Sequence, residues 1–306
     1  MLASLLALAV AAVGQATADV AVYQAVVPSP GPGESERVAG FGEALRVVAV
    51  RASGRRDAAS NGMVKSAAAA PASYVQQYAT TSDRMLRVGF DPIAIENLLQ
   101  KAGLPVWAQE RPTVLVVLPA SDTSARPTLE AAAQGRGVAL AWPQSGVDPA
   151  EARVRLADGD VARLGGVAGA VLVGAAAGEQ IEWTFAHAGE VTRARGSLAL
   201  GIDLAADALA TRYATPATRG VTRQTLRVNG VADVESYAGL MNYLGSLSMV
   251  RAVAVEELAG DTVTLGLTLR GDLELLRRFA ALEGRLQPAP AAADGTQPVA
   301  DFRYLQ

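Results

Sequence analysis

The sequence contains no cysteine and a single histidine, His187, among its 306 residues. The lack of cysteine excludes disulfides, thiol catalysis, thiolate metal ligands and a lipid-modified N-terminal cysteine. One histidine without a second histidine or cysteine cannot form a zinc site. No Gly-x-Ser-x-Gly elbow accompanies it, so a serine triad is not predicted either. We therefore expect a protein that is not an enzyme and that uses no metal or cofactor.

The sequence also has no excess of positive charge. The net charge is −3 and the isoelectric point is near 5.4, with lysine only at Lys65 and Lys101. Nucleic-acid-binding modules need clustered cations, so we expect no binding to nucleic acid. Half of the residues are apolar and 19% are charged, which is a globular composition. A chain of this length is expected to form about two or three domains.

No apolar run is long enough to span a bilayer, so no transmembrane segment is expected in the mature chain. The run at residues 1–13 is followed by Ala16-Thr17-Ala18, a small-x-small cleavage site. This pattern is typical of a signal peptide, here residues 1–18, although no Lys or Arg precedes the run. A buried helix is the alternative. We expect an exported protein, which in a double-membraned bacterium is periplasmic.

Residues 19–110 are predicted to form a first α+β domain in the order strand, helix, hairpin, helix. Alternating valines indicate the strand at 19–27, and apolar residues spaced by three and four indicate a helix that ends near Gly54. The hairpin covers 74–91. Asp91-Pro92 then opens the last helix, with a cap residue followed by a first-turn proline.

Residues 111–218 are predicted to form a central α/β domain. Residues 113–118 are apolar enough to be buried on both faces, which is typical of a strand in a parallel sheet. Helices are expected near 129–135, after Asp148 and at 204–213, and further strands at 138–142, 170–174, 180–188 and 190–201.

Residues 219–306 are predicted to form a second α+β domain. Residues 262–269 alternate strictly between threonine or glycine and an aliphatic residue, which indicates a half-buried strand. Asp233 and Asp272 are expected to cap helices, the first with Val234, Tyr237, Met241 and Leu244 on its apolar face. A Pro- and Ala-rich loop is expected at 287–298, and 301–306 as an edge strand. The predicted fold is two small α+β sandwich units flanking a central α/β domain, with one element order used twice.

Several short motifs are better explained by backbone geometry than by ligands. Asp158-Gly159-Asp160 lacks the other oxygen ligands of a calcium loop, and Gly260-Asp261 and Gly271-Asp272 are typical of turns and caps. Gly135-Arg136-Gly137 does not form a phosphate-binding fingerprint. His187 shares a strand face with large apolar residues, so a structural role is expected.

Five residues are candidates for weak contact with a partner or ligand. Arg55, Arg56 and Asp57 follow a glycine in a loop, while Trp107 and Arg111 lie in a proline-flanked link. The alternatives are a solvated loop and a tryptophan wedge between domains.

Some motifs also carry a family resemblance: Arg51-Ala-Ser-Gly54-Arg-Arg-Asp57, Tyr74-Val-Gln-Gln-Tyr78, Phe90-Asp-Pro92, Ala102-Gly-Leu-Pro-Val-Trp107 and Gly137-Val-Ala-Leu-Ala-Trp-Pro143. On these residues the chain resembles the bacterial domain-of-unknown-function family 2066. The resemblance implies an exported proteobacterial protein of unassigned function, without catalytic residues to transfer. The central unit also looks like domains of envelope assembly proteins, such as activators of cell-wall synthases.

The resulting hypothesis is a non-catalytic, envelope-associated module that binds an unidentified envelope protein. A sheet edge such as 250–258 would accept a partner strand, and arginine loops would set its register. The first alternative is a periplasmic protein that binds a small molecule near Trp107, and a hydrolase is the second. The sequence does not specify the oligomeric state.

Overall fold

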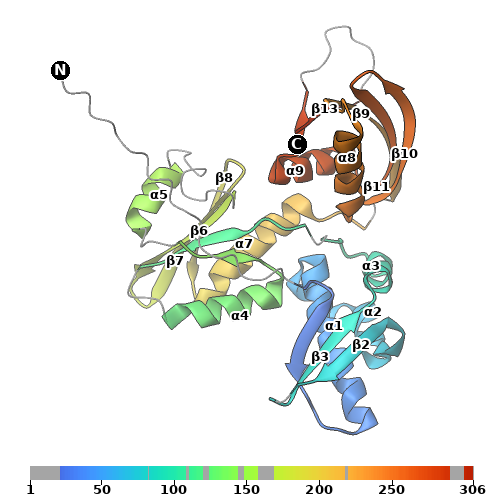
Figure 1. Ribbon diagram of the computed structural model, residues 1–306. Helices are drawn as coiled ribbons and strands as arrows, with labels where there is room; N and C mark the ends of the chain where they lie inside the picture. The colour runs from blue at the N-terminus through green and yellow to red at the C-terminus, as the bar shows by residue number, and fades with distance from the viewer. Residues whose placement is uncertain are drawn as a thin grey trace, which may run out of the picture. The chain divides into compact units, whose positions relative to one another are not determined.

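The computed structural model describes residues 21–81, 83–107, 110–119, 124–143, 148–157, 169–217, 220–289 and 300–305. These residues form a mixed α+β structure with eight α-helices and three sheets of three, five and five strands (Figure 1). The predicted fold class is therefore confirmed. By its contacts the described chain forms two compact units, Arg111–Leu209 and a second made of Ala21–Glu110 with Ala210–Gln306. The three domain boundaries drawn from the sequence stay a prediction.

The first sheet has the strand order β1-β3-β2, with β1 (Gln24–Pro28), β2 (Val75–Thr80) and β3 (Met85–Phe90) all antiparallel to their neighbours. Helix α1 (Glu34–Ser53) covers one face and ends at Gly54 in the left-handed conformation, as predicted. A short helix, α2 (Gly62–Ala69), follows. Asp91 caps α3 (Pro92–Lys101) by accepting a hydrogen bond from the Ala94 backbone N–H at 2.9 Å.

The second sheet has the order β10-β11-β9-β13-β12, from β9 (Val221–Asn229), β10 (Val250–Ala259), β11 (Thr262–Arg270), β12 (Leu286–Pro288) and β13 (Ala300–Tyr304). The alternation of β11 is confirmed, since Val263, Leu265, Leu267 and Leu269 are all buried. The expected edge strand at 301–306 is wrong in its position. β13 lies inside the sheet, parallel to β9 on one side and antiparallel to β12 on the other.

The two α+β parts share one topology as well as one element order. Strands β1, β2 and β3 correspond to β9, β10 and β11, because in each case the first strand pairs with the third and the second strand is outermost. Helices α1 and α3 correspond to α8 (Val234–Ser246) and α9 (Leu273–Glu283). Even a β-bulge recurs, at Gln76 in β2 and at Arg251 in β10.

The apolar face predicted for α8 is wrong by a rotation of the helix. Val234 is 83% exposed, while Ser236, Leu240, Tyr243 and Leu244 are buried. Asp233 does cap the helix, and it forms a reciprocal capping box with Ser236 that turns the Ser236 side chain inward. The buried set also has helical spacing, and it continues to Leu247, which is buried after the helix ends.

The third sheet lies in the Arg111–Leu209 unit and has the order β5-β4-β6-β7-β8. Its strands are β4 (Val114–Val117), β5 (Leu140–Ala141), β6 (Ala170–Ala177), β7 (Gln180–His187) and β8 (Glu190–Gly196), and its helices are α4 (Arg126–Arg136), α5 (Pro149–Ala157) and α7 (Leu198–Tyr213). Every residue of β4 is buried, as predicted for a strand covered on both faces. Residues from α5 pack on one face, and Gly201 of α7 lies against Trp183 on the other.

The strand predicted at 190–201 ends early. β8 stops at Gly196, and α7 begins at Leu198, because Ser197 accepts a hydrogen bond from the Leu200 backbone N–H at 3.4 Å. Helix α7 therefore starts six residues before the predicted helix. Among the described residues, no helix combines the length and the hydropathy needed to cross a membrane.

Candidate functional site

The loop charges singled out in the sequence largely satisfy each other. Arg55 forms a bidentate ion pair with Asp57, with its Nε 2.8 Å from Oδ1 and its Nη2 2.6 Å from Oδ2. The hydrogen bond from Arg55 lowers the pKa of Asp57 below its ordinary value. Both side chains are more than half exposed, and Arg56 is exposed beside them. The loop thus presents a neutral pair and one further cation to solvent.

Trp107 is completely buried. Its backbone N–H donates to the Ala52 carbonyl at 2.7 Å, and its ring lies beside Gly54 at the end of α1. The preceding residue, Val106, forms an isolated antiparallel bridge with Thr215. The indole therefore packs inside the unit made of Ala21–Glu110 and Ala210–Gln306, and it offers no surface to a partner in this conformation.

Arg111 and His187 both bind backbone carbonyls. The Arg111 Nη1 donates to the Gly137 carbonyl at 2.6 Å, at the C-terminal end of α4, where a cation is favoured. The His187 Nδ1 lies 2.8 Å from the Gly169 carbonyl, and the side chain is buried near Phe185. Arg111 belongs to a different unit from Trp107 and the Arg55 loop. Asp158-Gly159-Asp160 lies outside the described residues.

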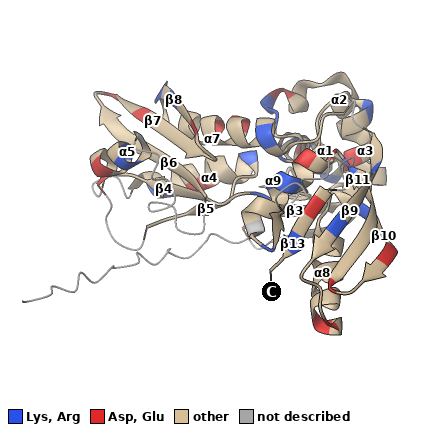
Figure 2. Cartoon of the chain, turned by 90° about the horizontal axis from the view of Figure 1, so that it is seen from above, with Lys and Arg blue, Asp and Glu red and all other residues tan. Residues whose placement is uncertain are grey.

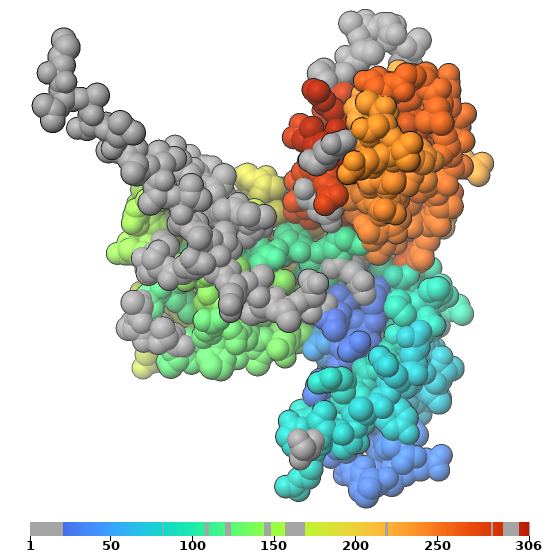
Figure 3. Space-filling view, in the orientation of Figure 1, coloured from blue at the N-terminus to red at the C-terminus, as the bar shows by residue number. Residues whose placement is uncertain are grey.

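Strand β10 is an edge of its sheet. It pairs with β11 on one side, and no described strand lies on the other. Eight of its ten residues are exposed, and the strand forms the outer margin of the second sheet in Figures 1 and 3. Val255 and Leu258 are 40% and 66% exposed. The edge proposed from the sequence at 250–258 is therefore available for pairing.

The edge of β10 carries charges and irregularities. Bulges interrupt the pairing at Arg251 and at Glu256, and Glu256 and Glu257 are both exposed. Figure 2 shows acidic residues on β10. Bulges and charges on an edge strand discourage pairing with arbitrary strands, so this edge is suited to a partner whose charges match it.

Strand β2 is the equivalent edge in the first sheet. Five of its six residues are exposed, and among the described residues only β3 pairs with it. Its sequence, Val-Gln-Gln-Tyr-Ala-Thr, contains no charge and no proline. The sequence predicted this strand as half of a hairpin, without a function.

A buried ionic cluster holds the two α+β parts together within their unit. The Glu96 side chain on α3, 8% exposed, accepts hydrogen bonds from the Tyr23 hydroxyl at 2.8 Å and from Arg251 Nη2 at 2.8 Å. Arg270, at the end of β11, binds the same carboxylate oxygen as Arg251. The chain positions of these residues are far apart, so no local pattern in the sequence predicts the cluster.

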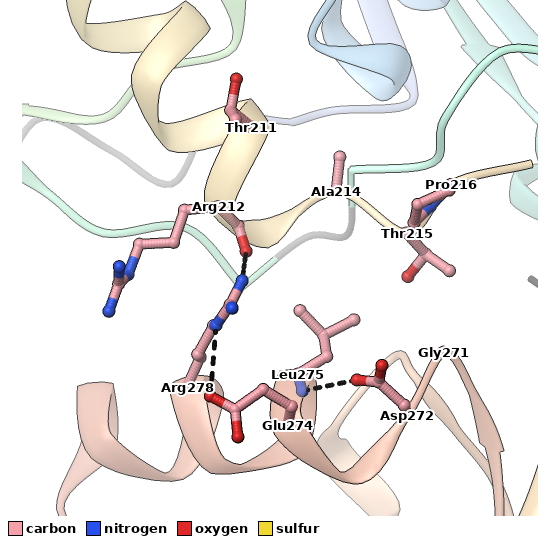
Figure 4. A pocket seen from close by; sticks show the side chains of 10 residues that line it. All are labelled: Thr211, Arg212, Ala214, Thr215, Pro216, Gly271, Asp272, Glu274, Leu275 and Arg278. Carbon is pink, nitrogen blue, oxygen red and sulfur yellow. Dashed lines mark hydrogen bonds and ion pairs between the residues drawn. The ribbon is translucent and has the colours of Figure 1, made fainter.

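A polar cavity of about 210 Å³ lies between the end of α7 with the segment that follows it and the first turns of α9 (Figure 4). Arg278 points across it and donates to the Arg212 carbonyl at 2.7 Å, and its Nε lies 3.7 Å from Glu274. Asp272 turns to the Leu275 backbone N–H as the helix cap. The side chains of Asp272, Glu274 and Arg278 bind each other or the backbone. The cavity volume is below that of most ligand sites.

A wider groove of about 650 Å³ lies between α2 and α3. Its lining includes the small residues Ala67, Ala70 and Ala94, together with Met63 and Leu98. Lys101 is its one charged lining residue. Among the described residues there is no cluster of three or more His, Asp or Glu side chains that could hold a metal ion.

Residues 16–108 match a family model described as "Domain of unknown function (DUF8605)". The match covers the first α+β part, from β1 to Trp107. No curated protein and no solved structure matches the chain.

The resemblance to family 2066 was wrong, because the matching model belongs to this other family. Several of the motifs that suggested it contain helix ends. Gly54 and Gly137 end helices in the left-handed conformation, and Asp91-Pro92 begins one. Such residues recur in unrelated folds because the backbone requires them.

Proposed function

We propose that the protein is an exported, non-catalytic interaction module of the cell envelope, and that it binds an extended segment of a partner protein along β10. One observation carries this proposal, namely the ten-residue edge strand whose outer side is free of pairing among the described residues. Main-chain hydrogen bonds to such an edge supply affinity, and side chains on alternate positions supply specificity.

The chemistry of β10 defines the partner segment. Glu256 and Glu257 favour a strand with basic residues at the facing positions. Val255 and Leu258 pair with Leu265 and Val263, which are buried, so they lie on the core face of the sheet, yet both are exposed. An apolar residue of the partner on this face would remove both from water. We expect a basic, alternating strand.

Export is supported by the signal-peptide pattern at residues 1–18, and periplasmic location follows from it in a double-membraned bacterium. Two observations support the lack of an enzymatic role. The sequence has no cysteine and one histidine, and the Nδ1 of that histidine, His187, is hydrogen-bonded to the Gly169 carbonyl.

The test is crosslinking in cells with a C-terminally tagged chain, followed by fractionation and identification of the captured protein. The variant Ala254→Arg places a cation on the solvent face of the β10 edge. Within its own sheet the new guanidinium would have a counter-charge. The Glu256 carboxylate lies over Gly266, and Gly266 is the cross-strand neighbour of Ala254. It would repel a basic partner strand.

The matched control is Ala79→Glu, because Ala79 holds the equivalent position on β2. Its new carboxylate would also have a counter-charge within its own sheet, because Ala79 is the cross-strand neighbour of Arg87 on β3. We expect one dominant envelope protein in the periplasmic fraction, strongly reduced capture with Ala254→Arg and unchanged capture with Ala79→Glu. Capture that Ala254→Arg leaves unchanged, or no captured envelope protein, overturns the proposal.

Small-molecule binding remains a second candidate function, and the groove between α2 and α3 favours it. Its volume of about 650 Å³ lies within the usual range of ligand sites. Lys101 on its wall would favour an anionic ligand. A thermal-shift screen of metabolites against the wild type and Ala67→Leu tests this, since a ligand of the groove would shift only the wild type. A flat response to the whole screen removes the alternative.

A further inference from the structure

Strands β2 and β10 hold equivalent edges of the two repeated sheets, yet they differ in charge. Pairing to β3 and β11 aligns Val75 with Val250, the bulged Gln76 with Arg251, and Ala79 with Ala254. From there β10 continues into a second bulge with two glutamates, whereas β2 ends without a charged residue. The protective features of an edge strand are thus present on one repeat and nearly absent from the other.

We propose that β2 pairs antiparallel with β2 of a second copy of this chain, so that two three-stranded sheets join into one across a twofold axis. A twofold contact places the same strand opposite itself, so a strand with a net charge would bring two equal charges close together. Residues 75–80 carry none, and the strand is therefore complementary to itself. On β10 a self-pairing centred on the second bulge would bring glutamates of the two copies together, and this disfavours that pairing.

The register of the pairing follows from the faces of the strand. Tyr78 and Thr80 pair with Val88 and Leu86, which are buried, so they lie on the core face, while Gln77 and Ala79 lie on the opposite face. Cross-strand neighbours share a face, so an antiparallel self-pairing must place one residue opposite its own copy. With Tyr78 at that position, Gln77 lies opposite Ala79 of the second copy, and Thr80 lies opposite Gln76 at the bulge.

The exposed ring of Tyr78 is the apolar surface that a second copy would bury at this edge. Its ring packs against Phe41 of α1, with the ring centroids 4.9 Å apart, yet the residue is 53% exposed at the end of the core. A second Tyr78 across the axis would cover the exposed side of each ring. The contact is small, so we expect a weak dimer that forms with rising concentration.

This dimer is independent of the proposed partner at β10, because the two edges belong to different sheets. Either proposal can fail without the other. In the capture experiment Ala254→Arg is the test variant and Ala79→Glu is the control. In the dimer experiment Ala79→Glu is the test variant and Ala254→Arg is the control.

The first test is sedimentation equilibrium of the purified mature chain over a concentration series. We expect a monomer–dimer equilibrium whose dissociation constant rises roughly tenfold or more in Ala79→Glu and is unchanged in Ala254→Arg. A monomer at all concentrations overturns the proposal, and so does a dimer that Ala254→Arg weakens and Ala79→Glu does not.

The second test uses the absence of cysteine from the chain. In Tyr78→Cys the two new thiols face each other across the axis, at a Cα separation that a disulfide spans. With oxidised glutathione as the oxidant, we expect a covalent dimer from Tyr78→Cys and none from Val253→Cys, the equivalent position on β10. Equal crosslinking of the two variants, or none from Tyr78→Cys, contradicts the proposed register.

Discussion

Gln76 and Arg251 are the extra residues of two equivalent β-bulges, and both bind helix α3. The Gln76 side-chain amide lies 3.3 Å from Asp91, the cap of α3, and Arg251 lies 2.8 Å from Glu96, one turn further along. A bulge re-aims the side chain of its extra residue. Here it aims both residues at one helix, so α3 fixes the start of both edge strands.

The Glu96 cluster is expected to be a main source of stability for this unit. Replacement of Glu96 by Gln removes the carboxylate and leaves Arg270, 11% exposed, and Arg251 without a counter-charge. Removal of one partner from a buried ion pair leaves the other charge uncompensated, and it lowers the free energy of unfolding by about 3 kcal/mol. Urea unfolding monitored by circular dichroism measures this change.

The matched control for Glu96→Gln is Glu43→Gln. Glu43 pairs with Arg46 at 2.9 Å on the surface of α1, where both side chains are well exposed. Its replacement is expected to change the free energy of unfolding by less than about 0.5 kcal/mol. Equal losses from the two variants would show that burial of the cluster has no energetic consequence.

Two glycines with the same backbone conformation differ in their surroundings. Gly54 has φ of 70° and Gly103 has φ of 69°. A Cβ at Gly54 would lie 2.4 Å from the Ala210 Cβ and 3.0 Å from the Trp107 ring, whereas one at Gly103 would meet nothing within 4 Å. Both substitutions by alanine lose about 1 kcal/mol to left-handed strain.

Only Gly54→Ala should also disturb the packing around Trp107, which adds roughly 1 to 3 kcal/mol. Thermal unfolding of Gly54→Ala and Gly103→Ala, with tryptophan fluorescence as a second readout, measures the difference. If the two variants lose the same stability, then the close approach of Gly54, Trp107 and Ala210 is not maintained in solution.

The cap of α8 is expected to make stability depend on pH. Hydrogen bonds from the Ser236 backbone N–H and hydroxyl lower the pKa of Asp233 below its ordinary value. A carboxylate with a lowered pKa stabilises the fold above its unfolded pKa, near 3.9, and this contribution is lost as the pH falls through the folded pKa.

Asp233→Asn keeps a hydrogen-bond acceptor but cannot ionise. We expect its deficit in stability relative to wild type to be largest near neutral pH and to disappear in acid. Urea unfolding of both proteins between neutral pH and pH 2 tests this. A difference that stays constant with pH would mean that the charge of Asp233 does not contribute.

Local signals predicted most of the elements. Asp91, Asp233 and Asp272 cap helices, Gly54 ends one, and β11 alternates as the sequence indicated, because each depends only on residues that are near neighbours in the chain. The sheet edge at 250–258 was also predicted from the sequence.

Long-range relationships could not be predicted in the same way. Arg270 meets Glu96 across 174 positions in the chain, and β13 enters its sheet beside β9 from the far end of the sequence. Of the five candidate contact residues, only Arg55 and Asp57 pair with each other, and Trp107 is buried. A single sequence does not record which segments meet, so the role of Trp107 required the structure.

Helix α8 shows why the apolar face of a short helix is ambiguous in sequence. The sets Val234, Tyr237, Met241, Leu244 and Ser236, Leu240, Tyr243, Leu244 both have helical spacing, and the capping box selects the second. Truncation of Leu240, which is fully buried, to alanine should lower the free energy of unfolding by about 2 to 5 kcal/mol. Val234→Ala should change it by less than about 0.5 kcal/mol, because Val234 is exposed. Urea unfolding of the two variants decides between the faces, and a larger loss from Val234→Ala would restore the face predicted from the sequence.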